Sequence, residues 1–96
     1  MEIQKSDVVL SEAGRDQGML FFVIDTDGVY VSLVNGKERK LENPKRKKLK
    51  HLRFAARIDS NVASKIFNGD KVLNSELRRD LAIYGQTLTV RTKEAE

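Results

Sequence analysis

The chain has 96 residues and no cysteine, which excludes a disulfide framework and a thiolate metal site. No apolar run approaches the roughly 20 residues that a helix needs to span a bilayer, and the N-terminal residues lack the apolar core of a signal peptide. We therefore expect one cytoplasmic domain with no membrane partner.

Short runs of apolar and β-branched residues, separated by glycine, asparagine, aspartate or proline, predict strands throughout the first half of the chain. The strands are expected at residues 7–11, 19–24, 29–34, 37–41 and 49–54. Asn35-Gly36 is the strongest hairpin signal, because a type I′ turn needs positive φ at both central residues. Pro44 cannot donate to a strand ladder, so residues 45–48 are expected to form a charged loop. Five short strands predict a mainly-β fold, a small SH3-like barrel over residues 1–56.

Helical signals follow in residues 57–96, which we expect to form an extension that packs on or beside the barrel. Ser60 is placed to cap a helix that ends near Asn68-Gly69. Asn74 or Ser75 is placed to cap a second helix, and Gly85 is expected to end it. On that helix the spacing of Leu77, Leu81 and Tyr84 predicts one apolar face. Residues 87–90 are expected to form a late strand or an ordered tail, and residues 93–96 are expected to be disordered.

Positive charge is concentrated in residues 37–53. This stretch contains nine lysines and arginines and two acidic residues, whereas the remainder contains nine basic and twelve acidic residues. Such an uneven distribution predicts an anionic partner more strongly than the net charge of +4 does. If the partner is a nucleic acid, binding will depend on salt, because each neutralised phosphate releases counterions.

The lead Lys5-Ser6-Asp7, the loop Gly14-Arg15-Asp16-Gln17-Gly18 and the apolar strand after it resemble the KOW motif. That family pattern has a Lys-Gly-Asp lead, a Gly-Lys/Arg-Asp-Lys-Gly-Lys loop and a hydrophobic strand. The basic stretch 44–52 is similar to that of small bacterial KOW proteins related to archaeal and eukaryotic large-subunit ribosomal proteins. The resemblance implies an SH3-like barrel and RNA as the partner, ribosomal RNA in particular, with ribosomal proteins as further partners.

The chain departs from the family pattern at three positions. Ser6 stands where the pattern has glycine, and Gln17 and Met19 stand where it has lysines. The tip of the loop therefore keeps one basic residue, and we expect most RNA contacts from the 37–53 segment. Its leucines, at 41, 49 and 52, are expected to hold its cations on one face. The expected RNA-binding residues are Arg15, Lys37, Arg39, Lys40, Lys45, Arg46, Lys47, Lys48, Lys50, His51 and Arg53.

Non-catalytic, ribosome-associated RNA binding is the function we expect. His51 is the single histidine, and no set of nucleophile, base and orienting group can be assembled, so no enzyme activity, catalytic residue, metal, cofactor or small-molecule substrate is expected. Two alternatives stay open. One is a protein-interaction module of the transcription or translation machinery, and the other is an enzyme or enzyme subunit that acts on nucleic acid. DNA is a variant of the main hypothesis, because phosphate contacts alone do not separate it from RNA.

Overall fold

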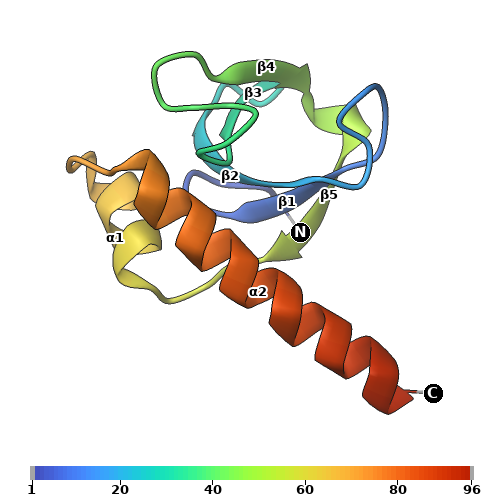
Figure 1. Ribbon diagram of the computed structural model, residues 1–96. Helices are drawn as coiled ribbons and strands as arrows, with labels where there is room; N and C mark the ends of the chain where they lie inside the picture. The colour runs from blue at the N-terminus through green and yellow to red at the C-terminus, as the bar shows by residue number, and fades with distance from the viewer. Residues whose placement is uncertain (1, 96) are drawn as a thin grey trace.

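The computed structural model describes the backbone of residues 2–95 and the side chains of residues 2–86. Five antiparallel strands form one sheet in the order β4-β3-β2-β1-β5, and two helices follow (Figure 1). The elements are β1 (Val8–Ser11), β2 (Leu20–Thr26), β3 (Tyr30–Val34), β4 (Lys45–Lys48), the 3-10 turn η1 (Leu49–His51), β5 (Leu52–Ala56), α1 (Asn61–Asn68) and α2 (Asn74–Ala95). The expected mainly-β fold is confirmed.

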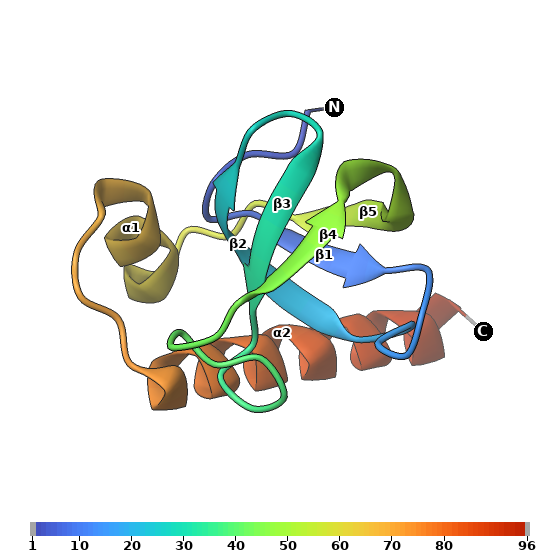
Figure 2. The same ribbon diagram turned by 90° about the horizontal axis from the view of Figure 1, so that it is seen from above.

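The sheet is strongly curled, and both helices lie on its outer side (Figures 1 and 2). Strands β4 and β5 are its two edges, and no pairing between them is found among residues 2–95. The sheet is therefore open, and the barrel expected from the sequence is not closed by hydrogen bonds.

Strand β2 contributes to two separate cores, because successive side chains of a strand point to opposite faces. Phe21 and Val23 face the concave side, where they pack with Val9, Val31, Leu33 and Leu52. Phe22 faces the outer side and packs with Val8, Val34, Leu77 and Leu81. Both phenylalanines are fully buried. The helices thus cover the Phe22 side chain on the outer face of the curled sheet. Burial of each phenylalanine contributes roughly 2–3 kcal/mol to the stability of the fold.

Helix α1 begins and ends where the sequence predicts. The Ser60 hydroxyl accepts a hydrogen bond from the Ala63 N–H at 3.1 Å, and Gly69 ends the helix with φ of 77°. That backbone conformation is unfavourable for any residue with a Cβ, so glycine suits this position. Between these ends, α1 buries Val62 and Ile66 against the outer core.

Helix α2 differs from expectation at both ends. It begins at Asn74, whose side chain does not cap it but accepts from the Leu41 N–H at 2.9 Å and donates to Glu42 at 2.7 Å. It continues through Gly85 to Ala95, so the predicted stop, the late strand and the disorder of 93–95 are wrong; residue 96 lies outside the described residues. Glycine within a helix costs only about 1 kcal/mol, which a continuous helix tolerates.

The apolar face predicted for α2 is present. Leu77 and Leu81 are buried in the outer core, and the Tyr84 hydroxyl donates to the Ala55 carbonyl on β5 at 3.1 Å. Within the part of the chain that the structure describes, no helix is long and apolar enough to cross a membrane.

The predicted strand at 37–41 is wrong, because its backbone donors are used by side chains. The Asn35 carboxamide oxygen accepts from the N–H groups of Lys37 and Arg39, at 3.0 and 2.9 Å, while Leu41 donates to Asn74. Such local bonds compete with a strand ladder. Strand β3 pairs instead with β4, the segment expected to be a charged loop.

Candidate nucleic-acid interface

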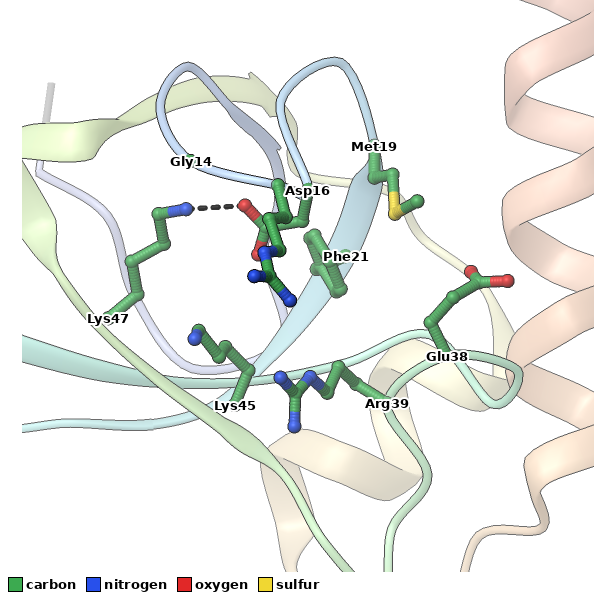
Figure 3. Close-up of a pocket in the computed structure, with 9 residues that line it drawn as sticks. Gly14, Asp16, Met19, Phe21, Glu38, Arg39, Lys45 and Lys47 are labelled. Carbon is green, nitrogen blue, oxygen red and sulfur yellow. Dashed lines mark hydrogen bonds and ion pairs between the residues drawn. The ribbon is translucent and has the colours of Figure 1, made fainter.

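Four of the predicted basic residues line one hollow beside the concave core, namely Arg15, Arg39, Lys45 and Lys47. Arg15 comes from the β1–β2 loop, Arg39 from the β3–β4 connection, and Lys45 is the first residue of β4. The hollow has a volume of about 510 Å³, and Met19 and Phe21 contribute apolar lining. Figure 3 shows the Arg39 side chain extending toward Lys45, with Phe21 close by. We call Arg15, Arg39 and Lys45 the open rim.

Strand alternation decides which cations of β4 reach the hollow. Lys45 lies opposite Leu33 and Lys47 opposite Val31, so both point to the concave side. Arg46 and Lys48 alternate with them and point to the other face. The expectation that the interleaved leucines hold all these cations on one face is therefore wrong, because β4 is a strand and divides them.

Lys47 is buried, with 9% of its side chain exposed. Its ammonium donates to the Ser11 hydroxyl at 2.8 Å, to the Ala13 carbonyl and to the Asp16 carboxylate, an ion pair drawn as the dashed line in Figure 3. A lysine ammonium has three protons, so these acceptors satisfy it fully. We call Ser11, Ala13, Asp16 and Lys47 the paired wall; it ties β4 to the β1–β2 loop.

The Asp16 carboxylate is the anionic half of this wall. Burial by itself raises the pKa of the carboxyl, but the hydrogen bonds from Lys47 and Ser11 and the positive charge of Lys47 outweigh burial and hold the pKa below its ordinary value. The Ser11 hydroxyl donates to the same carboxylate at 2.7 Å. Gly14, with φ of 82°, turns the chain directly against the Asp16–Lys47 pair. The neighbouring Arg15 is thereby presented at the tip of an anchored loop.

The open rim has no such partners. Among residues 2–86, no carboxylate forms an ion pair with Arg15, Arg39 or Lys45. Glu38 also lines the hollow, where its carboxylate accepts from the Asn35 side chain at 3.0 Å and lies 4.0 Å from the Lys37 ammonium. The three cations of the rim outnumber this one carboxylate, so the hollow keeps an excess of positive charge.

On the opposite face of β4, Arg46 already has partners. Its guanidinium lies 4.4 Å from the centre of the Tyr30 ring and 3.7 Å from the Asp27 carboxylate. The N–H groups of Tyr30 and Val29 bind that carboxylate and lower the pKa of Asp27. This arrangement is a stacked, locally neutralised surface rather than an anion site.

The remaining predicted residues lie apart from the hollow. Lys48 and Lys50 flank a second hollow of about 450 Å³ beside Val29 and Leu49. Lys37 and Lys40 are exposed in the β3–β4 connection, and His51 is half-buried in η1. Arg53 is exposed on β5, 4.0 Å from Glu12. Of the eleven predicted residues, the structure thus joins Arg15, Arg39 and Lys45 at one place, with Lys47 in the adjoining wall.

Sequence reasoning missed the apolar lining and the paired wall. Recognition of residues 45–48 as a strand would have divided their side chains between two faces. Nothing in the sequence showed that the Lys47 ammonium would reach Asp16, 31 residues away along the chain.

Comparison of the chain with models of known protein families gives no match, and comparison with curated proteins gives no significant relative. Within the described residues, no group of three histidine, aspartate or glutamate side chains is placed to hold a metal ion.

Proposed function

We propose that this chain is a non-catalytic RNA-binding protein, associated with the ribosome, that contacts RNA phosphates through the open rim. The observation that carries the proposal is the convergence of Arg15, Arg39 and Lys45, from three separate segments, on one hollow where none of them forms an ion pair with a described carboxylate. Arginine binds phosphate oxygens in a bidentate manner, and each neutralised phosphate releases condensed counterions.

We further propose that the open sheet is an SH3-like fold of the KOW class. Support comes from the strand order, from the 3-10 turn directly before the last strand, and from Ser6. Ser6 occupies the position of the family's glycine and adopts φ of 74°, a conformation that favours glycine. In the loop that follows, Gly14 and Gly18 also have positive φ.

Within this proposal the predicted residues have different tasks. The open rim binds phosphates, and Lys47 positions the loop that carries Arg15. The exposed lysines at 37, 40, 48 and 50 add a longer-range positive field that attracts the nucleic acid. Base-specific readout is not part of this function, because phosphate contacts carry no sequence information.

The proposal is tested by binding of the whole chain to ribosomal RNA fragments and to duplex DNA of equal length, at several salt concentrations. We expect a preference for structured RNA and a log–log salt slope that corresponds to about three or more phosphates. Absent or salt-independent binding would overturn the proposal.

The alternative, a protein-interaction module, is favoured by one observation. Phe67 at the end of α1 and Leu73 before α2 expose 63% and 52% of their surfaces. A partner protein that binds to these apolar side chains would still bind at high salt. Its binding would be lost in Phe67→Ser and unchanged when residues of the open rim are substituted.

A further inference from the structure

The hollow is larger and more apolar than a site that binds only a phosphate needs to be. Its volume of about 510 Å³ lies within the range of pockets that enclose small organic groups, roughly 300–1,000 Å³. A phosphate held at a surface needs charge but neither depth nor apolar lining. Met19, which is half-buried, provides an apolar surface here, and the fully buried Phe21 lines the hollow from the concave core.

The chemistry of the rim complements that lining. Arg15 and Arg39 come from two independent connections, and guanidinium planes stack on unpaired bases as well as binding phosphates. Lys45 adds a third cation from the edge strand. A ligand that fits has a flat, partly apolar group for the hollow and a phosphate on each side for the rim. A nucleotide within a strand has this combination.

A base in an A-form helix cannot enter such a hollow, because it is stacked and paired, and proteins contact the helix mostly through its shape, phosphates and 2′-hydroxyls. We propose that the hollow takes one unpaired nucleotide of an RNA bulge or loop, with the base over Met19 and the flanking phosphates on Arg15, Arg39 and Lys45. The proposal rests on the RNA binding proposed above and names the structural class of RNA.

The test compares three hairpins that share one stem. The first has a single-nucleotide bulge, the second is fully paired, and the third has an abasic residue at the bulge, which keeps the phosphate and removes the base. We expect the bulged hairpin to bind about tenfold more tightly than the other two, the effect of one stacked base. Equal affinity for all three would overturn the proposal, as would a preference that the abasic hairpin retains.

A variant that removes the apolar side chain gives a second readout. Met19→Ser takes away the surface on which the base is placed without changing the charge of the rim. We expect the preference for the bulge to fall to about twofold or less, while the salt slope stays that of the unmodified chain. A preference that stays at the unmodified level would count against the hollow as the site of the base.

Failure of this proposal is distinguishable from failure of RNA binding itself. If the three hairpins bind equally but with a steep salt dependence, the phosphate-binding function stands and the base site is rejected. If none binds, both are rejected. Tighter binding of a free mononucleotide than of the bulged hairpin would reject RNA as the source of the ligand.

Discussion

The open rim and the paired wall are neighbouring regions that each contain a lysine of β4, yet the two lysines have different roles. Lys45 and Lys47 lie two residues apart on one face of β4. Lys47 is buried and satisfied by three oxygens, including the Asp16 carboxylate, whereas Lys45 faces the hollow without a described carboxylate partner. The acceptor within reach, rather than the charge, determines which lysine stabilises the fold and which is available to a ligand.

The largest expected difference between the two regions is in stability. In Lys47→Met the Asp16 carboxylate remains mostly buried, with 15% of its side chain exposed, and loses its cation. We expect the free energy of unfolding, measured with urea, to fall by roughly 3 kcal/mol, the lower end of the cost of breaking a buried pair. Lys45→Met, the matched control on the same strand face, should change it by less than about 0.5 kcal/mol. Equal losses in the two variants would remove the distinction between wall and rim.

Low pH is expected to reduce the stability that the paired wall contributes to the fold. The pKa of Asp16 is lower in the folded chain than its ordinary value of 3.8, so its contribution to stability is complete above that value and is lost as pH falls through the lower, folded pKa. We expect the unmodified chain to be more stable than Asp16→Asn at about pH 6, and the difference to narrow toward about pH 3.

Comparison with Asp16→Asn separates this effect from other acids that titrate in the same window. The pKa of Glu76 is lowered by hydrogen bonds from Lys65 and the Leu73 N–H, and that of Asp27 by backbone N–H groups. Both contributions are common to the two proteins. A stability difference that stays constant with pH would show that the Asp16 charge does not contribute to the wall.

Substitution of Gly14 is expected to reduce stability less than loss of Lys47 does, but to affect both the paired wall and the open rim. Its φ of 82° disfavours a Cβ, and a Cβ there would meet the Lys47 ammonium at 3.5 Å. We expect Gly14→Ala to destabilise the fold by about 1–2 kcal/mol. Because the adjacent Arg15 moves with the loop, RNA affinity should fall as well. Gly69→Ala, with φ of 77° outside the site, is the control that shares the strain but should leave RNA affinity unchanged.

The smallest effect is expected on the other face of β4. Arg46 is exposed and paired with Asp27 and Tyr30, so Arg46→Gln should change stability by less than about 0.5 kcal/mol. It should leave the salt slope of RNA binding unchanged, whereas Lys45→Gln should reduce that slope by about 1. A larger loss of RNA affinity in Arg46→Gln than in Lys45→Gln would show that RNA binds to the Arg46 face of β4, which would contradict the open rim as the interface.

Much of the fold was predictable, because it depends on local signals. Three strands, the Ser60 cap and the Gly69 end of α1 follow from alternation and capping rules, which act within a few residues. Of the candidate site, only the basic segment at residues 37–53 and Arg15 could be predicted from the sequence. These predictions needed only the local charge and the loop motif, and no knowledge of contacts between distant residues.

The errors arose where distant residues override local signals. Residues 37–41 look like a strand until Asn35 and Asn74 take their backbone donors, and Gly36 is pressed against the start of α2, where a Cβ would lie 2.2 Å from the Asn74 carbonyl oxygen. Residues 45–48 look like a solvated loop until they pair with β3 and Lys47 meets Asp16. Pairing across such distances is not encoded in any short window.

The central claim is that the open rim binds RNA, and a matched pair of double variants tests it most directly. Arg15→Gln/Lys45→Gln removes two rim cations, and Lys71→Gln/Arg79→Gln removes one lysine and one arginine exposed on the helical side. Affinity for one structured ribosomal RNA fragment is measured for both across a salt series. The account predicts that the rim variant loses affinity at least tenfold and has a salt slope lower by about 2, while the helical variant stays near the unmodified chain. Equal losses in the two variants would contradict it, because only total charge would then matter.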